Sequence, residues 1–220
     1  MLSFRNALRF CCAFALVFCP LLVHADTLNL VSTTGGSVNG EDIYPYNFSI
    51  NGSSSLTSLV CLDYNRQVSI GEQWQVSVQS LDLGSSQTAI DYRTDAILYY
   101  VFGQYGLSNS DVQYAIWSIF DPDITSNTGF TSTSQTLVDY ASYYAADPDV
   151  INSGFFSNFV LYTPTADQTG WTNGTPQEFI GAASAAPTPE PSSLALLGTG
   201  LISTALSFRK RFAARAEEVA

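Results

Sequence analysis

Hydrophobic and polar residues alternate in short runs near the start of the chain, and this two-residue period predicts β-strands. β-Branched and aromatic residues fill four such runs, which Gly35-Gly36, Asn51-Gly52 and Gly71 separate as turn signals. Asn-Gly after an alternating run is also a strong hairpin signal. The predicted strands are Leu28–Thr33, Tyr46–Ile50, Thr57–Asp63 and Trp74–Leu81.

The period changes in the middle of the chain. Apolar residues recur there at three- and four-residue steps, which favours amphipathic helices over Thr88–Tyr105, Asp111–Phe120 and Ser134–Ala145. Ser110 is the expected N-cap of the second helix, and Pro122 ends it. The expected inward-facing residues are Ala89, Ile90, Arg93, Ala96, Ile97, Tyr100 and Val101 in the first helix, Val112, Ala115, Ile116, Ile119 and Phe120 in the second, and Leu137, Tyr140, Ala141 and Tyr144 in the third.

Strand patterns return after the helices. Asn158–Tyr162 and Gln177–Ile180 are predicted as the last two strands. Strands at both ends of the region with about three helices between them predict a single β-rich α+β domain over residues 26–181. This length is sufficient for one domain with its own core.

A longer apolar run lies at the N-terminus. Arg5 and Arg9 precede the almost wholly apolar segment Cys11–Val23, and Val23-His24-Ala25 offers the small residues that a signal peptidase reads. The segment is shorter than the ~20 residues that a membrane span needs. Residues 1–25 are therefore predicted to be a signal peptide that is cleaved after Ala25.

A second apolar run lies near the C-terminus. Leu194–Phe208 is apolar except for small Gly, Ser and Thr residues, and it stands between a Pro-rich stretch and a basic cluster. As a helix it reaches ~22 Å, and basic residues at its end favour the cytoplasmic side of a membrane. The tail is thus divided into a linker over 182–191, a transmembrane sorting helix with its basic stop over 192–211, and a cytoplasmic tail over 212–220.

The order of parts in this tail carries a family resemblance. Pro189-Glu190-Pro191, the apolar helix and Arg209-Lys210-Arg211 resemble the PEP-CTERM sorting signal of exported proteins of Gram-negative bacteria. The resemblance implies that exosortase, a membrane cysteine protease-transpeptidase, acts at or near the Pro-Glu-Pro motif. It also implies passage through the export machinery and the inner membrane to the cell surface or the extracellular matrix. The signal is a substrate and implies no catalysis by this chain.

Removal of the signal peptide would change the available chemistry. Cys11, Cys12, Cys19 and the only histidine, His24, would leave with it, so that Cys61 is the one remaining cysteine. The mature chain then has no Ser-His-Asp or Cys-His catalysis, no His-ligated zinc or iron and no internal disulfide. No nucleotide-binding glycine motif is present. We therefore expect no cofactor and no enzyme activity.

The domain is strongly acidic. Sixteen Asp and Glu stand against two Arg between Asp26 and Ala186, a net charge of −14, which repels nucleic acid. Two Asp-Pro-Asp motifs place carboxylates close together, and these are candidates for calcium binding or for an acid–base pair in glycoside hydrolysis. A turn in which Asp bonds nearby backbone is the other interpretation. The four residues are Asp121, Asp123, Asp147 and Asp149.

Cys61 and Gln113 form the candidate reactive pair. Gln113 to Trp117 reads Gln-Tyr-Ala-Ile-Trp, which resembles the Gln-x-Ala-Ile-Trp signature of bacterial thioester domains. In that family a cysteine thiol condenses with a glutamine amide, ammonia leaves, and the thioester then acylates an amine on a host or matrix molecule. The resemblance implies that Cys61 is the acyl carrier, Gln113 the acyl donor and Trp117 a shield against water. In the other interpretation Gln113 is exposed and Cys61 is an inert core residue.

These observations predict an exported, non-enzymatic surface or extracellular-matrix protein that adheres through a thioester. Its partners would be exosortase and an amine-bearing surface ligand or extracellular polysaccharide, and nucleic acid is not expected. A secreted carbohydrate-binding or carbohydrate-active protein is the alternative.

Overall fold

The computed structural model describes residues 25–102, 104, 106–165 and 175–183. Most of the predicted signal peptide, the Pro-Glu-Pro motif, the predicted sorting helix and the tail lie outside these residues. The chain divides into two units, Met1–Ala182 and Ala183–Ala220, and every helix and strand below belongs to the first. Among the described residues, no helix combines the length and the hydropathy that crossing a membrane requires.

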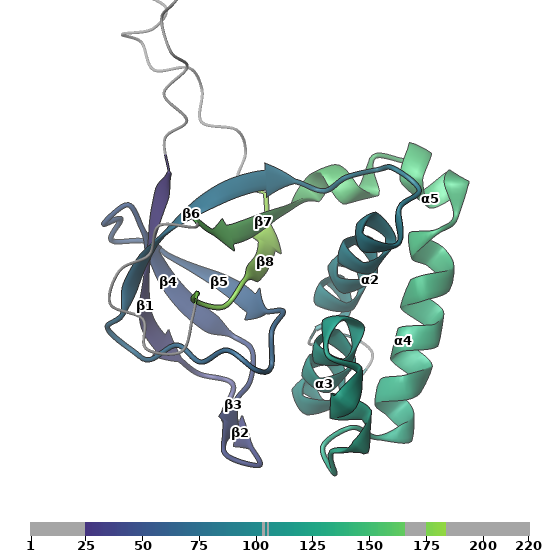
Figure 1. The fold of residues 1–220 in the computed structure, drawn as a ribbon, viewed down its shortest axis with the longest axis horizontal. Helices are drawn as coiled ribbons and strands as arrows, with labels where there is room; N and C mark the ends of the chain where they lie inside the picture. The colour runs from purple at the N-terminus through teal and green to yellow at the C-terminus, as the bar shows by residue number, and fades with distance from the viewer. Residues whose placement is uncertain (1–24, 103, 105, 166–174, 184–220) are drawn as a thin grey trace, which may run out of the picture. The chain divides into compact units, whose positions relative to one another are not determined.

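Six antiparallel strands close into a barrel in the order β1-β4-β5-β8-β7-β6. Closure comes from β1, which pairs with β4 on one side and with β6 on the other, so that the sheet has no free edge (Figure 1). The last two strands of the sequence insert between β5 and β6, which precede the helices. The strands are β1 (Asp26–Thr33), β4 (Tyr46–Ile50), β5 (Leu56–Cys61), β6 (Gln73–Ser80), β7 (Phe159–Pro164) and β8 (Phe179–Ala182).

A two-stranded hairpin of β2 (Ser37–Val38) and β3 (Glu41–Asp42) projects from the barrel between β1 and β4 (Figure 1). Asn39 and Gly40 form its turn, both with positive φ, which is the backbone that a two-residue hairpin requires. The Asn39 side chain donates to the Asn127 carbonyl oxygen Oδ1 at 3.0 Å. The hairpin tip is therefore tied to the segment that follows the second helix.

The helices form a layer beside the barrel (Figure 1). Three long helices contact one another, and α2 and α3 also contact strands β8 and β5 of the barrel. Short helical turns fill the connections. The elements are α2 (Gln87–Val101), α3 (Asn109–Phe120), η1 (Pro122–Ser126), α4 (Ser132–Ala145), α5 (Pro148–Asn152) and η2 (Phe155–Asn158).

Two hydrophobic cores meet at α3. One lies between the helices and the barrel and includes Val112, Ala115 and Ile116 of α3. The other fills the barrel and includes Tyr114 and Trp117 of the same helix. Because opposite sides of α3 pack into different cores, the helix is fixed in both position and rotation. The residues between those sides are consequently held in place.

The predicted elements agree with the structure in type and order. The α+β class, the six runs of strand and the three long helices are confirmed, with boundaries displaced by a few residues. The second helix begins at Asn109 instead of Asp111 because Ser108, and not Ser110, is its N-cap. The hairpin β2–β3, the short helix α5 and closure of the sheet into a barrel were not predicted.

Three inward-facing predictions were wrong. Phe120, Tyr100 and Tyr140 are 39%, 50% and 55% exposed. Helix α4 instead buries the small residues Ala141 and Ala145 completely, so the helices approach one another through alanine. Tyr100 and Tyr140 are left to line an apolar hollow of about 470 Å³.

Candidate functional site

The fold brings Cys61 and Gln113 together. Cys61 is the last residue of β5, and Gln113 lies in the first half of α3, 52 residues later. The side-chain amide nitrogen of Gln113 donates to the backbone carbonyl oxygen of Cys61 at 2.9 Å. Both side chains are fully buried. The interpretation with an exposed Gln113 is therefore wrong, whereas burial of Cys61 is confirmed.

Helix geometry places Gln113 and Trp117 on one side of α3. Residues four apart lie one turn above each other, and both side chains are buried. The helix starts at the Ser108 cap, whose hydroxyl accepts from the Ser110 backbone N–H at 3.2 Å. The Gln-x-x-x-Trp spacing thus turns the amide and the indole toward the same end of the barrel.

The carbonyl oxygen of the Gln113 side chain also has a fixed partner. The backbone N–H of Tyr44, which precedes β4, donates to this oxygen at 3.2 Å. Attack on the amide carbon would place negative charge on this same oxygen, and a preorganised N–H donor stabilises such charge. The amide is therefore held between β5 and the segment before β4, with its reacting carbon oriented by two backbone groups.

Cys61 lies in an apolar and aromatic environment. Its thiol donates to the Asp63 carbonyl oxygen at 3.1 Å. Burial raises the pKa of the thiol to about 12, and polar contacts with Asp63, Trp117 and Gln177 oppose this rise only in part. A free Cys61 would therefore be protonated at neutral pH. An uncharged group such as a thioester carries no such desolvation cost.

Trp117 closes the site from the side of the helical layer. Its indole ring packs against Tyr64 and Tyr114, with both ring centroids 5.1 Å away and the planes steeply inclined. Only 2% of Trp117 is exposed. The expected role of Trp117 in excluding water is thus compatible with its burial beside the thiol.

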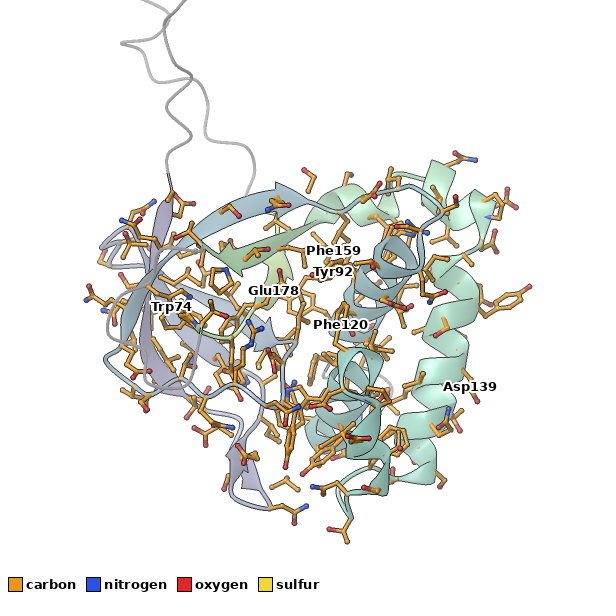
Figure 2. All side chains as sticks on the ribbon, viewed as in Figure 1. Trp74, Tyr92, Phe120, Asp139, Phe159 and Glu178 are labelled. Carbon is orange, nitrogen blue, oxygen red and sulfur yellow. The ribbon has the colours of Figure 1, made fainter. Side chains whose placement is uncertain are left out.

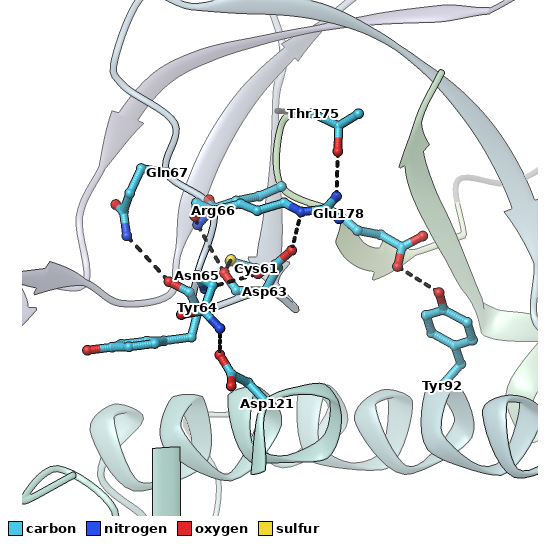
Figure 3. A network of polar contacts seen from close by, with 11 residues as sticks. Cys61, Asp63, Tyr64, Asn65, Arg66, Gln67, Tyr92, Asp121, Thr175 and Glu178 are labelled. Atoms are coloured by element: carbon cyan, nitrogen blue, oxygen red, sulfur yellow. Dashed lines mark hydrogen bonds and ion pairs between the residues drawn. The ribbon is translucent and has the colours of Figure 1, made fainter. Parts of the chain in front are cut away.

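A covering loop of residues 62–68 passes over Cys61 and is tied down by polar contacts (Figure 3). Asn65 donates to Asp121 at the end of α3. Arg66 forms an ion pair with Asp63 at 2.9 Å and donates to the Thr175 hydroxyl at 2.6 Å. These contacts join the loop to the helices on one side and to the approach to β8 on the other.

A cavity of about 380 Å³ lies beside the covering loop and includes Asp121 and Glu178 in its lining. Glu178, the residue before β8, accepts from the Tyr92 hydroxyl of α2 at 2.8 Å (Figures 2 and 3). Burial, together with Asp123 and Asp63, raises the pKa of the Asp121 carboxyl. The lining thus combines carboxylates with Arg66 and with apolar side chains.

The Asp-Pro-Asp motifs lie at the starts of short helices. Pro122 and Pro148 occupy first-turn positions of η1 and α5, and the Asp147 side chain accepts from the Asp149 backbone N–H at 2.8 Å. The second motif thus follows α4, and its Asp147 bonds nearby backbone as predicted, while also capping the next helix. No group of three or more His, Cys, Asp or Glu among the described residues is placed to hold a metal ion.

The predicted sorting residues fall outside the described part of the chain. These residues are Pro189, Glu190, Pro191, Arg209, Lys210 and Arg211. Ala25 is described, and it directly precedes β1. Cleavage after Ala25 would therefore leave β1 whole, with Asp26 as its first residue. Asp26 is already held by a 2.8 Å hydrogen bond from the Asn51 side chain.

Sequence reasoning missed three parts of the site: the Tyr44 N–H, the Gln177 side chain beside the thiol, and the acidic hairpin that carries Glu41. The hairpin had a readable signal, because Asn39-Gly40 is a two-residue turn sequence. The other two had none. A backbone N–H has no residue signature, and Gln177 reaches Cys61 only because β8 inserts next to β5.

Comparison with known proteins gives three results. No curated protein matches the chain. The N-terminal domain of the Streptococcus pyogenes pilus tip adhesin Cpa is similar in structure, with a TM-score of 0.38 and 10% sequence identity over 72% of this chain and 94% of that domain. Residues 187–211 match the model of the PEP-CTERM protein-sorting motif. This motif implies processing by exosortase and sorting to the cell surface of a Gram-negative bacterium. The resemblance of the tail is thereby confirmed, and the chain carries a PEP-CTERM protein-sorting motif over its C-terminal residues 187–211.

Proposed function

We propose that the globular domain is an adhesive module that forms an internal thioester between Cys61 and Gln113. The sorting motif delivers this domain to the cell surface or the extracellular matrix. The thioester then attaches it covalently to an amine-bearing ligand. Each molecule reacts once, so the protein is a covalent adhesive and not a turnover catalyst.

The proposed chemistry balances in two steps. First, the Cys61 sulfur attacks the Gln113 side-chain carbon; the new carbon–sulfur bond replaces the carbon–nitrogen bond, and the amide nitrogen leaves as ammonia with the thiol proton. Second, an amine attacks the same carbon. The carbon–sulfur bond breaks, an amide forms, and the Cys61 sulfur recovers a proton from the amine.

The observation that carries the proposal is the contact between Gln113 and Cys61 inside a dry site. The side-chain amide nitrogen of Gln113 donates to the backbone carbonyl oxygen of Cys61 at 2.9 Å, although the residues are far apart in sequence. Both residues are fully buried. Water exclusion protects a thioester from hydrolysis, and the Tyr44 N–H supports charge on the Gln113 oxygen during both steps.

The intact mass of the exported, mature domain tests the proposal. We expect a mass below the sequence value by one ammonia, because one amide nitrogen is lost for each bond. Incubation with methylamine should then raise the mass by one methylamine and release one free thiol. Both changes are read by mass spectrometry under non-reducing, denaturing conditions.

Two variants remove the bond from opposite sides. Cys61→Ala and Gln113→Ala should each show the full sequence mass and no reaction with methylamine. Gln135→Ala serves as the matched control, since Gln135 is an exposed helical glutamine on α4. It should keep the deficit. A full mass in the unaltered domain, with a thiol that titrates after unfolding, overturns the proposed thioester.

The sorting step is tested by removing the tail. A chain that ends at Ala186 keeps the whole unit Met1–Ala182 but lacks the matched motif. In a host with exosortase we expect this form to be exported and to lose its surface location. Cell fractionation with antibody detection measures the change. The same surface fraction for both forms would contradict exosortase-dependent sorting.

A further inference from the structure

A small cavity of about 110 Å³ lies between the β2–β3 hairpin, the covering loop and α3. Its lining includes Glu41 and Asp42 of the hairpin, Tyr64 of the loop, and Tyr46, Trp117 and Gln177. The volume is enough for about three water molecules at ~30 Å³ each, and it also fits the end of one slender side chain. Its walls come from three separate parts of the fold.

The cavity lies against the neighbours of Cys61. Trp117 and Gln177 are part of its lining, and the Gln177 amide and the Cys61 thiol donate to the same Asp63 carbonyl oxygen. Trp117 also shares its side of α3 with Gln113. The cavity is therefore lined in part by residues that surround the Cys61 sulfur.

The outer end of the cavity is acidic. Glu41 accepts from the Gln67 side chain at 3.0 Å through Oε2, and Asp42 accepts from the Thr33 hydroxyl at 2.9 Å through Oδ2. Neither carboxylate is paired with a cation in the described residues, where Arg66 forms its ion pair with Asp63. The cavity mouth therefore presents negative charge toward an incoming group.

A buried acceptor in the wall lacks a partner. Gln177 is 4% exposed, and its amide nitrogen donates to the carbonyl oxygens of Asp63 and Arg66. Its carbonyl oxygen Oε1 has no hydrogen-bond partner among the described residues. Leaving a buried acceptor without a donor is unfavourable, so a donor that enters this cavity would supply the missing hydrogen bond.

We infer that this cavity is the entry site for the acyl acceptor, and that it selects a primary amine carried by a slender, cationic side chain of the lysine type. This inference rests on the proposed thioester. The two carboxylates attract the ammonium group, and the unpartnered Gln177 oxygen receives one of its N–H donors. An uncharged alcohol gains neither the ion pair nor a second donor.

The recognition step also supplies the proton transfer that aminolysis needs. The ammonium nitrogen has no lone pair, so one proton must pass to a carboxylate, for which Glu41 is placed at the mouth. The neutral amine then attacks the Gln113 carbon, the bond to Cys61 breaks, and the amine's second proton passes to the released sulfur. Glu41 is left protonated and returns its proton to the solvent, so that atoms and charge balance.

Aminolysis of the full mature domain by two small nucleophiles tests the inference. Methylamine is cationic at pH 7.5, whereas hydroxylamine is uncharged at that pH. We expect Glu41→Gln to slow the reaction with methylamine about tenfold, through loss of a charge-assisted contact. Its reaction with hydroxylamine should change less than about twofold, because no ammonium is recognised. Mass spectrometry follows the conversion in both cases.

Asp139→Asn is the matched control, because it removes the same charge from the outer side of α4 (Figure 2). It should leave both rates unchanged, which separates local recognition from net charge. Equal slowing with both nucleophiles, or no slowing with methylamine, overturns the entry site while the thioester stands. A domain with full mass before any nucleophile is added overturns both the thioester and the inference. Thermal unfolding of Glu41→Gln confirms that the variant is folded.

Discussion

Replacing Gly35 by alanine is expected to destabilise the domain by about 1–3 kcal/mol, the usual cost of forcing an atom into a packed site. A Cβ at this position would lie 1.9 Å from the Tyr44 carbonyl oxygen and 2.4 Å from the Ile43 carbonyl oxygen. These are backbone atoms and cannot move aside as a side-chain end can. Backbone hydrogen bonds join the two segments on either side of Gly35. The Thr34 N–H donates to the Pro45 carbonyl oxygen, and the Ile43 N–H donates to the Gly36 carbonyl oxygen.

The same substitution should impair the reactive site. Displacement of Tyr44 withdraws the N–H that holds the Gln113 oxygen, so we expect the ammonia deficit in the mass to fall together with the unfolding free energy. Urea unfolding and intact mass measure the two effects.

Gly84→Ala is the control for Gly35→Ala. The nearest atom that a Cβ there would meet is a carboxylate oxygen of Asp82 at 3.1 Å, the end of a flexible side chain. This variant should stay within about 0.5 kcal/mol of the original domain and keep its mass deficit. A Gly35→Ala domain with unchanged stability and an intact thioester would show that the close approach of these two segments does not fix the site.

Replacing Asp95 by leucine is expected to stabilise the domain by about 1–3 kcal/mol at neutral pH, because it removes an unsatisfied buried group. Asp95 lies in α2 and is completely buried. Neither carboxylate oxygen has a hydrogen-bond partner among the described residues. Leucine has the same branching pattern and brings only apolar atoms into the helical core.

The stability gained by Asp95→Leu should depend on pH. Burial, with smaller contributions from Asp91 and Glu178, raises the pKa of Asp95 well above its ordinary value of 3.8. The folded domain therefore holds this proton more tightly than the unfolded chain does. The stability that this tighter proton binding contributes is fully present below pH 3.8, and it is lost as the pH rises through the pKa of Asp95 in the folded domain. The advantage of the leucine variant should accordingly grow as the pH is raised from 4 toward neutrality.

Asp95→Asn separates the two causes, since it keeps polar atoms but cannot ionise. It should abolish the extra pH slope and give less stabilisation than leucine. Thermal unfolding from pH 4 to 8 measures all three proteins. A leucine variant that is less stable than the original domain at every pH would mean that Asp95 makes a stabilising contact, such as one with an ordered water.

Periodicity was sufficient for the elements of this fold and insufficient for their assembly. The run Tyr46–Ile50 was predicted with its observed bounds, because alternation and the Asn51-Gly52 turn agree. Helix faces were predicted less well where large aromatic residues were assigned inward. Tyr140 carries a hydroxyl and is more than half exposed, whereas Ala141 takes the contact with the neighbouring helices.

The candidate site was predictable in its residue types and unpredictable in its geometry. Cys61 and Gln113 were identified from short motifs, and the expected helix and strand do carry them. The Tyr44 N–H and the acidic cavity were not predicted. Both arise from segments that meet only after the barrel closes, and a backbone donor leaves no trace in residue identity.

The sequence by itself determined the sorting motif of this protein and the residues available for its chemistry. Such a motif is a local pattern of charged and apolar residues, which can be recognised without regard to the fold. Only the tertiary structure decided that Cys61 meets Gln113, that both are buried, and that an acidic cavity lies against the neighbouring Trp117 and Gln177. The physical reason is that these contacts join segments up to 116 residues apart, from Cys61 to Gln177, and depend on closure of a barrel that local periodicity does not encode.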